Sequence, residues 1–160
     1  MFNTRKRYIM DVLAKQVNDL LKNQYELGFQ YDEEKAEFYF SIDMNHVCLD
    51  VRIICREADK QVLMFAYVPI KIQESQYSAV LRLINKIQMD NFDSVSLFIN
   101  ENCNQLMSQS ALNVGADFRI DEEVFRFAFY PLVSALDDHF IEFIRIISAG
   151  DEEQVPDLDL

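Results

Sequence analysis

The sequence predicts an α+β domain in which an antiparallel sheet is packed by helices, with the element order α-β-β-β-α-β-β-α. Two observations carry this prediction. Three segments with the composition of strands follow one another between residues 37 and 68, separated by turns too short for parallel pairing. Three other segments, at residues 4–27, 73–91 and 121–148, repeat apolar residues at helical spacing.

Length and composition indicate one folded domain. A chain of 160 residues, half of them hydrophobic, is long enough to bury a core and too apolar to be disordered. We expect a single domain over residues 1–150. The last ten residues, 151–160, contain five acidic residues and a proline, and we expect them to form a flexible acidic tail.

The net charge and the cysteine content indicate which binding partners and which cellular compartment to expect. With 27 Asp and Glu against 15 Lys and Arg, the formal net charge of −12 repels phosphate backbones and anionic lipid, so we expect no nucleic-acid partner. No apolar run reaches the ~20 residues that span a bilayer, and no secretory signal core is present at residues 1–10, so we expect no membrane association. Three cysteines without a CxxC pair are typical of a reducing cytoplasm.

The first half reads as one helix and three strands. Residues 4–27 form an amphipathic helix that we expect to stop at Gly28, because a left-handed position suits glycine. Residues 32–35 are a polar connection. Strands are predicted at 37–43, 46–56 and 61–68, and the third is apolar on both faces, as expected of a strand covered on both sides. Pro69 removes a ladder donor and should end that strand.

The central helix, predicted over residues 73–91, carries an unusually wide apolar stripe. At 100° per residue the stripe covers about 200°, against the roughly 100° that one core contact needs. Either the helix is sunk between two layers, or its outer edge contacts a second copy of the chain. We expect a homodimer, with this candidate dimer face: Tyr77, Val80, Leu81, Leu83 and Ile84.

The second half reads as a hairpin and a long helix. Strands are expected at 92–100 and 106–114, and the second is polar enough to lie near an edge or to be half solvated. Asp121 is a strong N-cap for a helix that runs to about Ser148, and Pro131 should kink it. The alternation of Phe125, Phe127 and Phe129 also permits a strand at 124–130, but the cap favours the helix.

Opposite the main stripe of this last helix, Phe127, Tyr130 and Ile141 fall within about 60° of one another. They are either buried by a kink or a covering strand, or they form a contact patch for a partner. Exposed aromatic patches mark interaction sites, so these residues are the candidate partner patch.

No catalytic, cofactor or metal signature is expected. His46 and His139 lack the spacing of a metal pair, Cys48 and Cys55 point to opposite faces of one strand, and Cys103 lies in an Asn-rich turn. The run Asp137-Asp138-His139 could suggest a catalytic group. Consecutive residues on a helix do not face each other, however, so we interpret the run as a solvated face. The chain has no nucleophile elbow, Walker loop or dinucleotide fingerprint.

Several segments resemble the YbjN-like family, often labelled bacterial sensory transduction regulators, whose architecture is shared with class I chaperones of type III secretion. They are Tyr67-Val68-Pro69 before Val80-Leu81-Arg82-Leu83-Ile84-Asn85, Gly115-Ala116-Asp117-Phe118 before Asp121-Glu122-Glu123, and Leu132, Leu136 and Asp137. The likeness covers residues 8–148. Phe127 and Pro131 do not match the family pattern.

The resemblance implies a type III secretion chaperone-like fold and a small acidic protein, commonly dimeric, that acts through protein contacts. We therefore expect a non-catalytic protein-binding module, either a chaperone or a regulator, with a protein partner. The alternative is a small-molecule sensor or enzyme that uses a pocket between the sheet and the helices.

Overall fold

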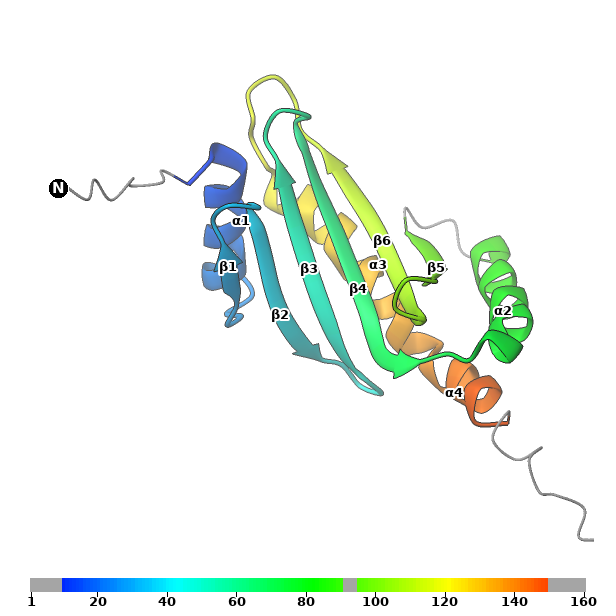
Figure 1. Ribbon diagram of the computed structural model, residues 1–160. Coiled ribbons are helices and arrows are strands. Elements are labelled where there is room, and N and C mark those ends of the chain that lie inside the picture. The colour runs from blue at the N-terminus through cyan, green and yellow to red at the C-terminus, as the bar shows by residue number, and fades with distance from the viewer. Residues whose placement is uncertain (1–9, 91–94, 150–160) are drawn as a thin grey trace, which may run out of the picture.

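The computed structural model describes residues 10–90 and 95–149, which fold into one six-stranded antiparallel sheet and four α-helices (Figure 1). The α+β class and the antiparallel pairing expected from the sequence are confirmed. The helices are α1 (Val12–Asn23), α2 (Tyr77–Asp90), α3 (Glu122–Asp138) and α4 (Phe140–Ala149), with a 3₁₀ turn η1 (Glu74–Gln76) before α2. The strands are β1 (Gln30–Asp32), β2 (Glu37–Asp43), β3 (Cys48–Arg56), β4 (Gln61–Lys71), β5 (Ser96–Asn100) and β6 (Gln105–Asn113).

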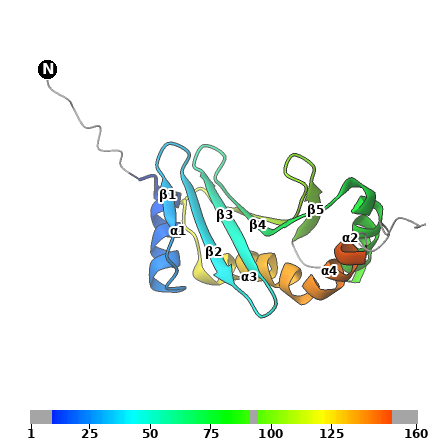
Figure 2. The ribbon, with the colours of Figure 1, turned by 60° about the horizontal axis from the view of Figure 1, so that its bottom comes forward.

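The strand order β1-β2-β3-β4-β6-β5 places the second hairpin beside the first three-stranded meander. The turns at residues 57–60 and 101–104 are where the sequence predicts them, and Asn104 has the left-handed φ of 56° that asparagine tolerates. Helices α1 and α3 lie on one face of the curved sheet, while α2 and α4 stand together beyond β5 (Figure 2). In the described part of the chain no helix covers the other face, which we call the open face.

The core lies between the sheet and helices α1 and α3. It is rich in aromatic rings: Phe125 stacks on Phe129 with centroids 5.9 Å apart, and Tyr25 meets Phe129 edge-on at 5.4 Å. Phe40 brings β2 to the same cluster, 6.2 Å from Phe129. Burying rings of this size supplies much of the apolar area that stabilises the fold.

Strand β6 lies next to the edge strand β5, which pairs only with residues 105–109, so the expectation that β6 lies near an edge is confirmed. Two of its polar side chains nevertheless face α3: the Ser108 hydroxyl donates to the Leu132 carbonyl at 2.6 Å, and the Ser110 hydroxyl donates to the Ala128 carbonyl at 2.9 Å. Both serines are buried. A small hydroxyl can enter a core without cost when a carbonyl accepts its hydrogen bond, so polarity here does not indicate solvent.

The N-terminal half departs from the sequence expectation at two places. Helix α1 ends at Asn23, five residues before Gly28, and the positive φ of 51° falls on Glu26. The chain then forms the short strand β1, which the sequence analysis does not predict and whose last residue, Asp32, begins the expected connection at 32–35. It pairs with β2 across the turn at residues 33–36, and its three residues are too few to show the alternation that predicts a strand. The expected helix start, residues 4–9, lies outside the described residues.

Strand β4 continues past Pro69 to Lys71, so the proline does not end it. The register with β6 shifts between Tyr67 and Lys71, and Pro69 is exposed there. A bulge of this kind tolerates a residue without an N–H. The expected strand start at residues 92–94 and the acidic tail at 151–160 lie outside the described residues.

The last helix is divided at His139 and not at Pro131. Helix α3 runs through Pro131, and His139 leaves helical geometry with φ −105° and ψ 3° before α4 begins. The strand alternative for residues 124–130 is therefore wrong. Pro131 has no N–H to donate to the carbonyl of Phe127 one turn earlier, and the helix continues without that bond. None of the helices in the described residues has the length and apolarity to span a bilayer.

Candidate functional site

The outer side of α3 presents a row of exposed apolar side chains. Phe127 and Tyr130 keep 63% and 64% of their surface open to water, and Val124 is exposed one turn before them. The three residues follow at intervals of three and so are neighbours on the helix surface. We call Val124, Phe127 and Tyr130 the α3 patch. The guanidinium of Arg126 lies 5.7 Å from the Phe127 ring centroid, close enough for a cation–π contact.

The position of the α3 patch is fixed by what the helix buries on its other side. Phe125, Phe129 and Leu132 are buried in the core, and the Asp121 carboxylate caps the helix by accepting from the backbone N–H groups of Glu123 and Val124. With the core side of the helix occupied, the patch can only point to solvent.

Ile141, the third residue of the candidate partner patch, is exposed but lies on α4. The sequence argument placed it beside Phe127 and Tyr130 by assuming one continuous helix. The break at His139 removes that angular relation. The α3 patch therefore stands on its own, with Val124 as a member that the sequence analysis missed.

The candidate dimer face on α2 is mostly occupied within the chain. Val80, Leu83 and Ile84 are buried against β5 and α4, and the half-buried Tyr77 donates its hydroxyl to Asn104 Oδ1 at 2.5 Å. The wide stripe is thus largely explained by two intramolecular neighbours. Leu81 is the one member of the set that is exposed, at 45%.

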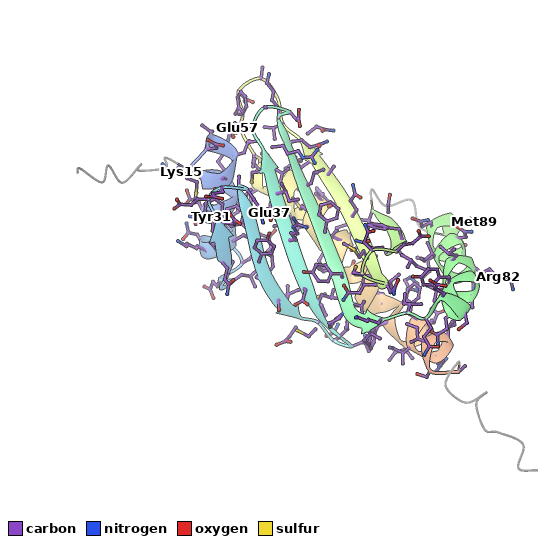
Figure 3. The ribbon with its side chains drawn as sticks, in the orientation of Figure 1. Lys15, Tyr31, Glu37, Glu57, Arg82 and Met89 are labelled. Carbon is purple, nitrogen blue, oxygen red and sulfur yellow. The ribbon has the colours of Figure 1, made fainter. Side chains whose placement is uncertain are left out.

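A second apolar residue of α2 is also exposed. Met89 has 78% of its surface open to water, two turns after Leu81. Both Met89 and the polar Arg82 project from the side of α2 that faces away from the sheet (Figure 3). Leu81 and Met89 define the outer edge of α2.

The side chains of Asp137, Asp138 and His139 do not form one cluster. Asp137 is buried and accepts from the backbone N–H of His46 at 2.7 Å and of Asn45 at 3.3 Å, which ties the end of α3 to the β2–β3 turn. His139 instead contacts Glu142 Oε1 at 3.2 Å, and Asp138 is exposed. Among the described residues, no group of three or more His, Cys, Asp or Glu side chains could hold a metal ion.

The three cysteines are free and separate. Burial raises the pKa of the Cys55 thiol to about 12, and a hydrogen bond to Asp43 raises the pKa of the exposed Cys48 thiol. Both shifts disfavour the thiolate, which is the nucleophilic form. Neither residue has the environment of a reactive cysteine.

The open face holds a hollow of about 630 Å³, on the opposite side of the sheet from α1 and α3. We call this hollow the open-face hollow. Cross-strand partners lie on the same face of a sheet, and the row Tyr39, Arg52, Phe65 and Gln109 forms the floor of the hollow. It is lined by Tyr39, Arg52, Ile54, Phe65, Tyr67, Phe98, Asn100, Cys103, Gln105, Met107 and Gln109.

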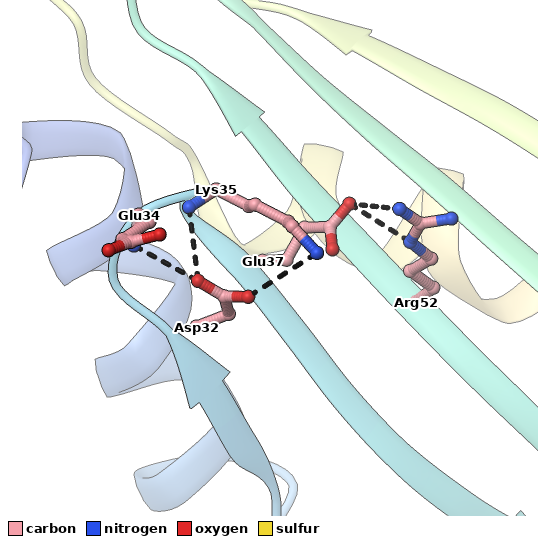
Figure 4. A network of polar contacts seen from close by, with 5 residues as sticks. All are labelled: Asp32, Glu34, Lys35, Glu37 and Arg52. Atoms are coloured by element: carbon pink, nitrogen blue, oxygen red, sulfur yellow. Dashed lines mark hydrogen bonds and ion pairs between the residues drawn. The ribbon is translucent and has the colours of Figure 1, made fainter.

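Arg52, which lines the hollow, forms an ion pair with Glu37. The Arg52 side chain donates from Nε to Glu37 Oε1 at 3.0 Å and from Nη2 to the same oxygen (Figure 4). Glu37 is only 3% exposed, whereas the Arg52 side chain is 42% exposed. In the described part of the chain, Glu37 Oε2 has no hydrogen-bond partner.

Sequence reasoning missed this pair, because it becomes visible only once the strand register is known. Residues 37 and 52 are fifteen positions apart and meet diagonally across β2 and β3. A partial signal was present in β4, whose residues at 61–68 are apolar on both faces. That pattern was interpreted as a strand covered on both sides, whereas Phe65 and Tyr67 line the hollow.

Comparisons with known proteins bear on the fold. No family model matches the chain, and no curated protein sequence matches it. Among solved structures, YbjN from E. coli has a TM-score of 0.56 at 14% identity, covering 89% of this chain and 94% of that chain. The chain has a YbjN-like fold. The resemblance inferred from the sequence is thereby confirmed at the level of architecture.

Two complexes contain the same YbjN-like, chaperone-like fold. The HopA1–SchA chaperone–effector complex has a TM-score of 0.56 at 11% identity, covering 79% of this chain and 92% of that chain. The ExsC–ExsE complex has a TM-score of 0.52 at 16% identity, with coverage of 86% and 97%. At these identities the likeness concerns the fold and carries over no functional residue.

Proposed function

We propose that this chain is a non-catalytic protein-binding module, chaperone-like or regulatory, that acts in the cytoplasm through protein contacts. The observation that carries the proposal is the α3 patch, in which Phe127 and Tyr130 are more than half exposed on a capped helix. Aromatic residues are enriched at the centres of protein interfaces, where a partner removes them from water. The chaperone–effector complex among the similar structures supports the same reading.

The surroundings of the α3 patch favour a partner with basic residues around an apolar centre. Glu122 and Glu123 are exposed in the first turn of α3, next to Val124, and Arg126 is engaged with Glu123 at 3.7 Å. With a formal net charge of −12, the chain attracts basic segments from a distance. Charge complementarity of this kind accelerates encounter and selects among partners.

The proposal includes a homodimer formed through the outer edge of α2. Leu81 and Met89 are the exposed apolar residues there, since the rest of the stripe is engaged within the chain. A two-fold axis near Leu81 would place the two copies of this edge against each other. This contact is on a different helix from the α3 patch.

A variant-controlled pull-down tests the partner surface. The chain is used as bait in lysate of its native cell, as wild type, as Phe127→Ser/Tyr130→Ser, and as Val12→Ser. Val12 is an exposed apolar residue on α1, so its replacement controls for loss of surface hydrophobicity. Because all three residues are exposed, we expect stability changes within about 0.5 kcal/mol per substitution.

We expect mass spectrometry to find one or more proteins enriched by wild type and by Val12→Ser and lost with the double variant. Circular dichroism confirms that each bait is folded. A set of captured proteins that the double variant retains contradicts the α3 patch as the partner surface. Recovery of no specific protein over several growth conditions contradicts the protein-binding function.

A further inference from the structure

We propose that the open-face hollow is a binding site for a small monocarboxylic acid with a flat or extended apolar body, and that Arg52 binds its carboxylate. This goes beyond the proposed protein-binding function, because the hollow lies on the open face. The α3 patch belongs to a helix that lies on the other face of the sheet (Figure 2). The two sites can therefore be tested independently.

The charge of the ligand follows from the lining. Of the eleven described residues that line the hollow, Arg52 is the one that carries a formal charge at neutral pH. A guanidinium has five N–H donors in a planar fork, and the contacts to Glu37 use Nε and Nη2. The side chain is 42% exposed, so its other donors can reach a carboxylate placed in the hollow.

Glu37 gives Arg52 a fixed position. The Glu37 carboxylate is 3% exposed, and one of its oxygens is unpaired among the described residues, so its burial costs free energy. An arginine in water would be stable without a buried carboxylate beside it. The pair holds the Arg52 guanidinium 5.7 Å from the Tyr39 ring centroid, beside the hollow. A charged group held in advance binds its counter-ion with a smaller loss of side-chain entropy.

The apolar part of the ligand follows from the remaining walls. Phe65, Phe98, Ile54 and Met107 line the hollow from four different strands. Its volume of about 630 Å³ falls in the range of about 300–1,000 Å³ typical of small-molecule sites. Apolar walls around a single guanidinium fit an acid whose body is flat or extended and uncharged.

The rest of the protein selects against more highly charged ligands. The net charge of −12 disfavours anions in general, and Asp50 lies on the same face as Tyr67, its partner in register, which lines the hollow. A second carboxylate on the ligand would have no cation to meet among the lining residues. We therefore expect monocarboxylates to bind better than dicarboxylates of equal size.

The test titrates two probes, 2-naphthoate and octanoate, into ¹⁵N-labelled full-length protein and follows the backbone amide resonances. The neutral amides of both acids serve as ligand controls. We expect each acid to shift resonances of β3, β4 and β6, and to bind at least about tenfold more tightly than its amide, because a hydrogen bond to a charged group is the stronger kind.

Two variants and one matched control locate the site. Gln109→Glu places a carboxylate two strands from Arg52 in the same row and leaves the Glu37–Arg52 pair intact. Glu37→Gln/Arg52→Met removes the pair together, so that no unpaired charge stays buried. Arg56→Gln removes one positive charge from an exposed position on the same strand, outside the lining.

We expect both site variants to weaken binding of the acids at least about tenfold, and the control to bind within about twofold of wild type. Three results overturn the proposal: no binding of either acid at millimolar concentration, equal binding of acid and amide, or binding unaffected by both folded site variants. A loss of binding that Arg56→Gln reproduces also overturns it, because the effect would then be one of overall charge.

Discussion

Cys55 shows how burial changes the chemistry of one side chain. It is almost fully buried on the core face of β3, and desolvation, followed by the nearby charges of Glu57 and Asp11, raises the pKa of its thiol from the ordinary value of 9.0 to about 12. Because the folded-state pKa is higher, the folded protein retains this proton where the unfolded chain loses it. The stability from Cys55 is complete below pH 9.0 and is lost as pH rises towards 12.

Replacing Cys55 by alanine should therefore flatten the decline of stability in base. At about pH 10.5 we expect wild type to have lost about 2 kcal/mol more than Cys55→Ala, each measured against its own value at about pH 8 by urea unfolding. Parallel curves for wild type and Cys55→Ala would refute the assignment.

The Glu37–Arg52 pair is a second prediction at this scale. Arg52→Met leaves the Glu37 carboxylate buried without its counter-charge, and we expect a loss of about 2–3 kcal/mol in the free energy of unfolding. The double variant Glu37→Gln/Arg52→Met should lose less than the single one, since no charge stays buried. Denaturant unfolding of wild type, Arg52→Met and the double variant measures both losses. A double variant less stable than Arg52→Met would show that Glu37 stabilises the fold in another way.

At the scale of elements, α2 shows what a helical pattern can and cannot tell. The stripe width correctly indicated more than one contact surface, but the sequence could not distinguish a second subunit from a second intramolecular neighbour. The structure supplies β5 and α4 as two such neighbours. Leu83 is consequently a core residue, and Leu81 lies at the exposed edge.

This difference gives Leu81→Glu and Leu83→Glu opposite outcomes. Leu83→Glu buries a charge among apolar residues and should cost several kcal/mol, with lost cooperativity in thermal unfolding. Leu81→Glu should retain the wild-type melting temperature within a few degrees while weakening the dimer in sedimentation velocity. A wild type that is monomeric at tens of micromolar rejects the dimer, and a dimer that Leu81→Glu leaves intact places its interface elsewhere.

Elements whose signals are local were predicted well, and those set by long-range contacts were not. Strand β2 at Glu37–Asp43 and the Asp121 cap of α3 follow from alternation and cap chemistry. Strand β1 has three residues, too few to show the alternation that predicts a strand, and the passage of β4 through Pro69 depends on β6, which is distant in sequence. The helix break at His139 has no glycine or proline to announce it. It lets Phe143 of α4 be buried and brings α4 against α2.

For the whole molecule, the sequence identified the aromatic residues of the α3 patch but not whether they were exposed. The sequence places Phe127 and Tyr130 opposite the main apolar stripe of the helix. In the structure that stripe packs on β4 and β6, and no described residue covers Phe127 or Tyr130. The open-face hollow was beyond sequence reasoning, because its lining comes from five strands brought together by register. The fold thus presents two distinct surfaces on opposite sides of one sheet.

The central claim is that the α3 patch contacts a protein partner, and site-specific photocrosslinking in the native cell tests it most directly. A photoreactive phenylalanine analogue is placed at Phe127, and at Glu34, an exposed position in the β1–β2 turn, as control. The account predicts discrete crosslinked species from position 127 that contain a protein other than this chain and are absent from position 34. Position 127 yielding no discrete species, or the same species as position 34, would contradict it.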